Sequence, residues 1–385
     1  MNAIPSRTKV LFLTSAYPTP EAMTSGIFVR EHARAAAREC DVAVVHLDRS
    51  DGIRVLRRQA AVAGEEFPTW RVRYPRRPLP LSYLGHVAAA VAGYRAARRA
   101  GFDPDVIHAH FFLAGVPAVL LGAVYRKPVV ITEHWSVFLP SDPMRLGPLS
   151  RRLAKFAFER AAFVLPVSEA LRDGIRAAGI EARFRIVPNA VDPLVFHPPA
   201  APHAGRRLLT VGGLYAAKAH DVLLRAAALL AECEPEVRLD IVGDGELRAE
   251  CERLAATLGI SDRVAFHGER PKSEVARLMR EADVFVLASR YENNPCAVLE
   301  ALMSGLPVVA TRVGGVPEIV NADNGLLVEP GDAPALARAS GAALARDDFD
   351  RPAIARAAAA RYGLEPVGDA LAAVYADALA ARVER

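Results

Sequence analysis

The sequence predicts an α/β protein built from two doubly wound halves, each a mostly parallel sheet covered by helices on both faces. Three observations support this fold class. With 385 residues, the chain is longer than a typical single domain of about 100 to 200 residues. Short apolar runs alternate with Ala-rich helical stretches along its length. The proline-bearing stretch Val195 to Arg207 cannot continue a helix and divides this alternation into two series.

The first series begins with the apolar run Lys9 to Thr14, which is bounded by Ser, Tyr and Pro as is typical of a buried parallel strand. A helix is expected next, capped by Ser25 or Gly26 and extending through Arg38. The further strands of this half are expected at Val42 to Leu47, Val106 to Ala109, Val129 to Thr132, Phe163 to Val167 and Arg185 to Val187.

The second series is expected to form strands at Leu208 to Val211, Arg238 to Val242, Val264 to His267, Val284 to Ala288, Val308 to Thr311 and Gly325 to Val328. We therefore predict a first domain at 1–197, a linker at 198–206, a second domain at 207–365 and a C-terminal helix at 366–385 that returns to the first domain. Ligands of doubly wound sheets bind beyond the carboxyl ends of the strands. The cleft between the two halves is therefore the expected site.

Composition argues against several classes of protein. The longest uncharged apolar stretch, Phe111 to Tyr125, is shorter than the roughly 20 residues that span a bilayer. The N-terminus lacks the apolar core of a signal peptide. Four scattered cysteines form no CxxC pair, and no clustered histidines complete a metal site, so we expect reduced thiols in a cytoplasmic protein without a metal. The sequence contains no GxxxxGK[ST] motif, and Gly243-Asp-Gly245 lacks the third glycine of a dinucleotide fingerprint.

Charge is distributed unevenly along the chain. Residues 1–200 hold 27 Lys and Arg against 17 Asp and Glu, whereas the remainder holds 21 against 27. A basic first half favours anionic lipid or phosphorylated partners, and an Arg-rich surface without such a partner explains the same count. Leu149 to Arg160 mixes apolar and cationic residues, which fits either a membrane-surface helix or a helix packed on its own sheet. No nucleic-acid partner is expected.

The most informative segment runs from Arg290 to Pro307 and directly follows a hydrophobic strand. Asn294 can serve as the N-cap of a helix, Pro295 fits its first turn and Gly305 fits its end. The free N–H groups and the positive dipole end of such a helix suit a diphosphate or sugar oxygens.

Two glutamates belong to this segment. Glu292 lies in the loop before the helix, and Glu300 lies inside it, on the same side as Cys296 by i to i+4 spacing. The pair resembles the hallmark of family 4 of the retaining glycosyltransferases, which is two glutamates with seven residues between them. Two glutamates at this spacing are common by chance, but the similarity continues through Ala301 to Glu318.

The resemblance implies a GT-B fold, with an acceptor-binding first domain and a donor-binding second domain. It also implies that Glu292 contacts the donor sugar and Glu300 the nucleotide ribose. Val211 to Lys218 is similar to the family's diphosphate-binding loop, in which Lys218 matches the lysine but Gly213 stands where an arginine is usual; Arg290 or Arg312 is a candidate replacement. The implied donor-binding residues are Gly26, Gly213, Lys218, Arg290, Glu292, Asn293, Asn294, Pro295, Cys296 and Glu300.

In the first half, Thr24 to Arg30 resembles the family loop that meets the donor phosphates, where Gly26 permits close backbone approach. Ile107 to Gly115 resembles the strand end that carries an active-site histidine, and the match falls on His110. His108 is the competing histidine on the same segment. Less specific matches give the acceptor or secondary candidates Ile27, His134 and Asn189.

The function implied is transfer of a sugar, with retention, from a nucleoside diphosphate sugar to a hydroxyl of a glycan, lipid-linked or small-molecule acceptor in polysaccharide or related biosynthesis. His110, Glu292 and Lys218 are the implied catalytic residues, and UDP is favoured over GDP. We expect no cofactor and no metal, because no DxD-like cluster follows the strands. Peripheral contact with the inner membrane face through the basic half is an open expectation. The alternatives are a nucleotide-sugar epimerase of GT-B shape and a non-catalytic nucleotide-sugar binding protein.

Overall fold

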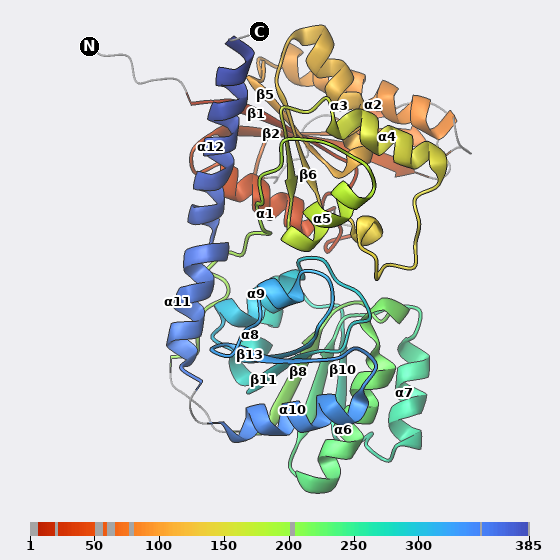
Figure 1. The fold of residues 1–385 in the computed structure, drawn as a ribbon, viewed down its shortest axis with the longest axis vertical. Coiled ribbons are helices and arrows are strands. Elements are labelled where there is room, and N and C mark those ends of the chain that lie inside the picture. The colour runs from red at the N-terminus through yellow and green to blue at the C-terminus, as the bar shows by residue number, and fades with distance from the viewer. Residues whose placement is uncertain are drawn as a thin grey trace. The chain divides into compact units, whose positions relative to one another are not determined.

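The computed structural model describes residues 7–19, 22–50, 57–59, 66–76, 81–200, 205–346 and 349–383. The chain folds into two compact units (Figure 1). The first unit consists of Met1–Phe138, Pro143–Ala190 and Leu364–Arg385, and the second of Leu139–Asp142 and Val191–Gly363. Residues 201–204 of the expected linker lie outside the described residues.

The first unit is built on a seven-stranded sheet of the described residues, with the order β3-β4-β2-β1-β5-β6-β7. Every neighbouring pair is parallel except β3 and β4. The central strands are continuous apolar runs with both faces buried, as expected of a parallel sheet covered by helices. The strands are β1 (Lys9–Thr14), β2 (Asp41–Ser50), β3 (Arg57–Gln59), β4 (Thr69–Pro75), β5 (Val106–His110), β6 (Val129–Glu133) and β7 (Phe163–Pro166).

Helices cover both faces of this sheet (Figure 1). They are α1 (Ile27–Ala36), α2 (Leu81–Arg99), α3 (Phe111–Tyr125), α4 (Pro148–Phe158), α5 (Glu169–Ala177) and α12 (Leu364–Val383), with a short 3-10 turn at Ser136–Phe138. The C-terminal helix α12 lies beside α1, where Val367, Leu371 and Tyr375 join the buried core of this unit. Burial of these side chains holds the end of the chain on the first unit.

The second unit contains a six-stranded parallel sheet of the described residues, with the order β10-β9-β8-β11-β12-β13. Its strands are β8 (Arg207–Val211), β9 (Arg238–Val242), β10 (Val264–Gly268), β11 (Val284–Leu287), β12 (Val308–Thr311) and β13 (Gly325–Val328). Its helices are α6 (His220–Cys233), α7 (Arg248–Thr257), α8 (Lys272–Glu281), α9 (Cys296–Met303), α10 (Ala333–Ala345) and α11 (Arg351–Tyr362), with 3-10 turns at Ala216–Lys218 and Val316–Glu318. The predicted class, two doubly wound α/β halves, is confirmed.

Two strand predictions need correction. Arg185 to Val187 is not a strand: the N–H groups of Arg185 and Val187 hydrogen bond to the Val164 and Pro166 carbonyls of β7, but only an isolated bridge between Phe184 and Val164 forms. Pro166 and Pro188 flank this pairing and have no N–H to extend it. Conversely, β3 and β4 were not predicted. The arginines of β4 alternate with buried residues, and Arg71 and Arg73 each pair with Asp48 of β2 at 3.0 Å.

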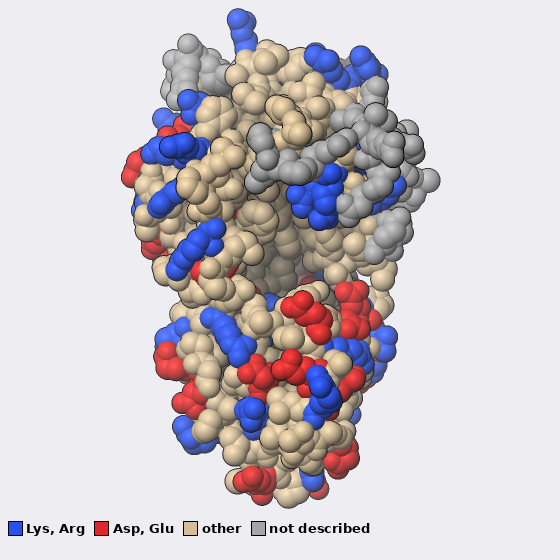
Figure 2. Space-filling view, turned by 90° about the vertical axis from the view of Figure 1, so that its right-hand side faces the viewer, with Lys and Arg blue, Asp and Glu red and all other residues tan. Residues whose placement is uncertain are grey.

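On the face of the first unit drawn in Figure 2, Lys and Arg side chains lie at several places, some grouped together and some next to acidic side chains. Helix α4 buries Ala154, Ala157 and Phe158 against its own unit, which agrees with the simple packing interpretation of that segment. Among the helices described, none combines the length and apolar character needed to cross a bilayer.

Candidate functional site

In the second unit, the loops that follow β8 and β11 start at the point where the sheet order reverses. The two strands are neighbours although three helices and two strands separate them in sequence. Side chains beyond the carboxyl ends of such a pair converge, and this is where doubly wound sheets bind ligands. The loop after β8 carries Lys218, and the loop after β11 carries Glu292.

Lys218 and Glu292 form an ion pair at this switch point. The lysine Nζ lies 2.5 Å from Glu292 Oε1, and Ser289 Oγ donates a hydrogen bond of 2.8 Å to the same oxygen. Thr311 Oγ1 in turn donates to the Ser289 carbonyl at 2.6 Å, which fixes the serine. Glu292 is only 9% exposed, whereas the Lys218 side chain keeps 28% of its surface accessible. A buried carboxylate is thus held in one position beside an accessible cation.

Glu300 lies within α9 and has a lysine partner of its own. Its Oε1 is 3.6 Å from Nζ of Lys272, which is the first residue of α8 and also lies over the Phe196 ring. Lys272 was not predicted as a site residue. The only sequence signal was a cation at the start of a helix that follows a strand. We call Ser289, Glu292, Lys218, Lys272 and Glu300 the carboxylate site.

The start of α9 differs in detail from the prediction. Pro295, and not Asn294, occupies the N-cap position, and no side chain caps the helix. Asn293 and Asn294 are both buried, while Cys296 is half-buried at the first helical position. Gly305 ends the helix with φ of +70°, as its sequence position predicted. Three residues, Asn293 to Pro295, therefore separate Glu292 from the first helical residue of α9.

Arg290 and Arg312, the candidate replacements for the arginine missing at Gly213, both pair with acidic side chains in this structure, and their role stays a prediction. The Tyr215 ring lies where a Cβ at Gly213 would project, at 2.3 Å. Arg290 makes two hydrogen bonds to Asp221, at 3.0 and 2.9 Å, and Arg312 pairs with Glu329 at 3.4 Å. Lys218 is the predicted diphosphate ligand that stands in the carboxylate site.

Gly314, from the motif after Glu300, supports Glu292 from behind. Its φ is +48°, and a Cβ there would lie 1.8 Å from the Glu292 carbonyl oxygen. Only glycine permits this backbone contact. The signal was present in the Thr-Arg-Val-Gly-Gly stretch, but the sequence did not reveal which backbone Gly314 contacts.

The first unit has an equivalent switch point between β1 and β5. Gly26 is the N-cap of α1 with φ of +63°, and a Cβ there would collide with the Ala16 backbone at 2.3 Å. The glycine therefore lets the loop after β1 fold back on itself, with Ile27 half-buried at the first helical position. His110 ends β5, and Phe111 after it has φ of +69°, a strained conformation for an aromatic residue.

His110 is fully buried beneath His134. Its Nδ1 lies 2.9 Å from His134 Nε2, and the two rings are stacked with centroids 5.2 Å apart. His134 is half-buried, and the buried Asn189 side chain hydrogen bonds its ring. The structure thus brings together three residues that the sequence analysis named, which are His110, His134 and Asn189. Of the two histidines, His134 is the one with a solvent-accessible side.

The competing histidine, His108, has a structural environment. Its Nδ1 and Nε2 lie 2.7 Å from Tyr375 and Thr132 hydroxyls, respectively, so both ring nitrogens are satisfied. Burial lowers the pKa of His108 and keeps the ring neutral. His108 links β5 to α12, and the assignment of the site histidine to His110 stays a prediction.

Glu133 positions the segment that carries His134. Its fully buried carboxyl group accepts backbone N–H bonds from Phe112 at 2.8 Å, His134 at 3.0 Å and Trp135 at 2.8 Å. Burial raises the pKa of Glu133 to about 7, although these three bonds oppose the shift. Sequence analysis did not identify Glu133 as a site residue.

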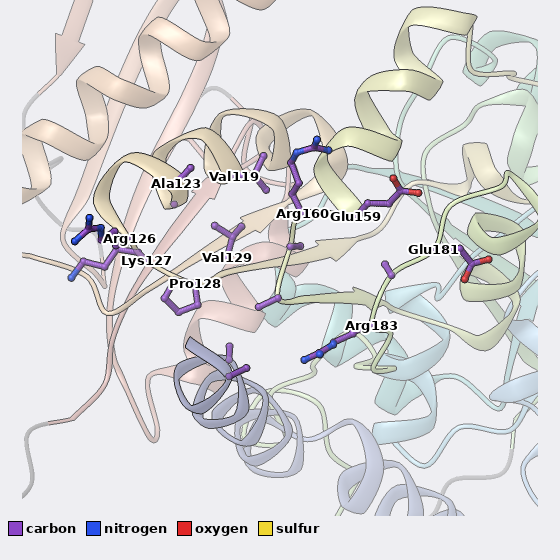
Figure 3. A pocket seen from close by; sticks show the side chains of 16 residues that line it. Val119, Ala123, Arg126, Lys127, Pro128, Val129, Glu159, Arg160, Glu181 and Arg183 are labelled. Atoms are coloured by element: carbon purple, nitrogen blue, oxygen red, sulfur yellow. The ribbon is translucent and has the colours of Figure 1, made fainter. Parts of the chain in front are cut away.

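A separate cavity of about 900 Å³ in the first unit lies at the opposite ends of these strands (Figure 3). Val129 at the start of β6 forms part of its wall, with Arg126, Arg160 and Arg183 around it. No predicted site residue lines this cavity. It is therefore distinct from the sites at the carboxyl ends of the strands.

Comparison with known proteins matches each half of the chain to a glycosyltransferase family. Residues 25–193 match the family described as Glycosyltransferase Family 4, and residues 205–346 match Glycosyl transferases group 1. The chain is 32% identical over 374 residues to a D-inositol 3-phosphate glycosyltransferase of Corynebacterium urealyticum, with 88% of this chain and 84% of that protein covered.

Solved structures share the fold over nearly the full length. Sucrose-phosphate synthase of Thermosynechococcus elongatus superimposes with a TM-score of 0.79 at 24% identity, covering 97% of this chain and all of that chain. Alr3699/HepE of Anabaena, solved in complex with UDP-glucose, gives a TM-score of 0.73 at 21% identity, covering 96% and 99% of the two chains. Both halves of the chain and its switch-point residues thus lead to one conclusion: the protein is a nucleotide-sugar-dependent glycosyltransferase with the GT-B fold, and it belongs to glycosyltransferase family 4.

Proposed function

We propose that the carboxylate site binds the donor, and that the enzyme transfers its sugar to a hydroxyl with retention of anomeric configuration. The observation that carries this proposal is the Lys218–Glu292 ion pair at the β8/β11 switch point, with Glu300 and Lys272 alongside in the same unit. A diphosphate needs cations and N–H donors, whereas sugar and ribose hydroxyls need acceptors. The carboxylate site offers both.

Each residue has a role in this proposal. Lys218 exchanges its contact with Glu292 for the donor diphosphate and stabilises the negative charge that develops as the diphosphate leaves. Glu292, still held by Ser289, accepts hydrogen bonds from the sugar hydroxyls, and Glu300 accepts from the ribose. Gly26 gives the loop after β1 its close backbone approach to the phosphates. Arg290, Asn293, Asn294, Pro295 and Cys296 shape the donor-binding loop, with Gly213 beside it.

In the first unit, we propose that the half-buried His134 contacts the transferred sugar and that the fully buried His110 orients it. The support is their 2.9 Å nitrogen-to-nitrogen contact and the difference in exposure. This refines the expectation that His110 itself touches the substrate. Ile27 and Asn189 remain candidates for acceptor contacts.

The donor is proposed to be a UDP-sugar, used without a metal ion. The UDP-glucose complex of the structural neighbour from Anabaena supports the base, and the E-x7-E resemblance supports retention. The acceptor hydroxyl belongs to a glycan, a lipid-linked glycan or a small molecule. The excess of Lys and Arg in residues 1–200 supports an anionic acceptor or contact with an anionic membrane surface in the cytoplasm.

The test is a panel of UDP- and GDP-sugars, screened first by thermal shift and then for release of nucleoside diphosphate with an acceptor panel. We expect stabilisation and turnover with a UDP-sugar, insensitivity to EDTA, and a product whose anomeric proton shows the donor's configuration by NMR. Donor conversion without any acceptor would indicate an epimerase. Binding without turnover for every acceptor would indicate a binding protein, and an inverted product would refute retention.

A further inference from the structure

Three histidines from separate segments meet at the carboxyl end of the first sheet. His32 lies on α1, His110 ends β5 and His134 follows β6, and one ring nitrogen of each lies within 4.8 Å of the others. Ring centroids are 5.7 Å apart for His32 and His110, and 5.4 Å apart for His32 and His134. We call these three residues the histidine cluster. Sequence analysis did not anticipate the histidine cluster, because the expectation of no metal site rested on the spacing of histidines along the chain.

Two buried nitrogens of the cluster lack a hydrogen-bond partner among the described residues. They are His32 Nδ1 and His110 Nε2, and both side chains are fully buried. A buried polar atom without a partner costs about 1 to 3 kcal/mol, and such atoms in native proteins often mark an unseen ion or water. Two of them in one cluster indicate a ligand that accepts lone pairs.

The tautomer of His32 fits this interpretation. Its Nε2 lies 2.9 Å from the Pro188 carbonyl oxygen, which can only accept, so this nitrogen carries the hydrogen and donates. His32 Nδ1 then carries no hydrogen, and its lone pair lies in the buried interior of the protein. Metal-bound histidines have this arrangement, with the second nitrogen donating to a backbone carbonyl that fixes the ring.

We propose that His32, His110 and His134 form a binding site for a divalent transition metal such as Zn²⁺. Three imidazoles and one open position are the ligand set of many zinc sites. Tetrahedral Zn²⁺ with bonds of about 2.0 to 2.1 Å holds its nitrogens about 3.4 Å apart. The ligand nitrogens of the three rings lie within 4.8 Å of one another here, so side-chain rotation is needed to bring them to this separation.

A bound metal has a consequence for catalysis that rests on the proposed function. His110 and His134 cannot both ligate the ion and orient the sugar, so the metal-bound enzyme is inhibited. Mg²⁺ and Ca²⁺ prefer oxygen ligands and leave activity unchanged. Zinc thus acts as a reversible inhibitor of an enzyme that turns over without it.

The binding test uses the full chain, stripped with EDTA and titrated with Co²⁺ as a spectroscopic probe and Zn²⁺ as a competitor. We expect one tetrahedral Co²⁺ per chain, with ligand-field bands and no thiolate-to-metal charge transfer, displaced by Zn²⁺. His32→Gln keeps an N–H donor for Pro188 but removes the imidazole, and should weaken binding at least tenfold. His197→Gln, at an exposed histidine outside the cluster, is the matched control.

Three results would overturn the proposal: no stoichiometric Co²⁺ on the wild-type chain, a thiolate signature, or undiminished binding by His32→Gln. If His32→Gln does not fold, the wild-type Co²⁺ stoichiometry and spectrum still decide. Activity is measured separately: Zn²⁺ should inhibit transfer, and EDTA should restore it. Metal binding without any transfer activity would refute the proposed function alone, and transfer without metal binding would refute the metal site alone.

Discussion

The carboxylate site of the second unit and the histidine cluster of the first occupy equivalent places, the switch points of two doubly wound sheets, yet they handle charge in opposite ways. The carboxylate site pairs each buried glutamate with a lysine, so its charges are retained and compensated. The histidine cluster places two fully buried rings beside the half-buried His134, and burial lowers the pKa of His110 so that this ring stays neutral. One site is suited to bind a charged, hydroxyl-rich donor. The other is suited to contact a neutral sugar.

The first prediction compares the two lysines of the carboxylate site. Lys218→Ala should lower the rate of nucleoside diphosphate release by about 100-fold or more, because it removes the cation that we propose stabilises the leaving diphosphate and leaves Glu292 buried without its ion pair. Lys272→Ala should cost less than about tenfold, since its contact with Glu300 is 3.6 Å long. Steady-state kinetics with the selected donor measures both. Equal losses would show that the ion pair at the switch point has no special role.

A second prediction concerns the glycine behind Glu292. Gly314→Ala should lower activity at least tenfold, because its Cβ would collide with the Glu292 carbonyl at 1.8 Å and displace the carboxylate loop. Gly331→Ala is the matched control: its φ is also positive, at +85°, but nothing lies within 4 Å of the added Cβ. That variant should lose about 1 kcal/mol of stability and keep its activity. A Gly314→Ala enzyme with wild-type activity would show that activity does not depend on the close backbone contact between Gly314 and Glu292.

A third prediction compares how much stability each of the two units loses at acidic pH. Burial lowers the pKa of His32, His46 and His86 in the first unit to about 4. These rings stay neutral when folded but bind protons when unfolded near pH 6.5, so the unfolded chain takes up more protons and stability falls as the pH drops from 6.5 to 4. Each contributes a loss of at most about 2 kcal/mol at pH 5.

The second unit has one such residue among its described histidines, His220, whose pKa burial lowers to about 4. Glu133 acts in the opposite direction in the first unit: its raised pKa of about 7 makes its contribution fall as the pH rises from 4.5 to 7. The histidines outnumber it, so acid should destabilise the first unit more. Hydrogen exchange of β1 and β5 amides against β8 and β11 amides, at pH 7 and pH 5, measures this. Equal destabilisation of both sheets would contradict it.

The smallest predicted effect concerns backbone strain. It compares the strained residue beside His110 with a strained residue at the other end of helix α3. Helix α3 has a positive-φ residue at each end, Phe111 beside His110 and the exposed Arg126 at its C-cap with φ of +54°. Arg126→Gly should raise the free energy of unfolding by about 0.5 to 1 kcal/mol without changing kcat, because glycine adopts this conformation without strain. Urea denaturation and kinetics measure the two quantities. A loss of activity in Arg126→Gly would show that strain at this distant end also serves the site.

Much of the fold could be predicted from the sequence. Buried parallel strands are continuous apolar runs, so β1, β9, β12 and β13 were placed to the residue. Strand β4 was missed because its charges are neutralised by Asp48 on a neighbouring strand, a contact that a local pattern cannot reveal. The chain's family was also predictable, because the E-x7-E segment is contiguous.

The sites were predictable only where one segment contains the chemistry. Glu292, Glu300 and Lys218 belong to local motifs, and the roles given to them remain predictions. Lys272 and Gly314 reach the carboxylate site through folding, and no local motif assigned them there. His32 was not considered at all, because helix α1 brings it to His110 and His134 from a distant part of the chain.

The central claim is that Glu292 is the carboxylate that holds the donor sugar, and Glu292→Gln tests it most directly. Glutamine keeps the size of the side chain but removes the charge that binds Lys218. Glu274→Gln, at an exposed carboxylate paired with Arg277 in the same unit, is the matched control. Initial rates of sugar transfer should fall by about 100-fold or more in Glu292→Gln and stay within about threefold of wild type in the control. A Glu292→Gln enzyme that transfers sugar as fast as the control would contradict the claim.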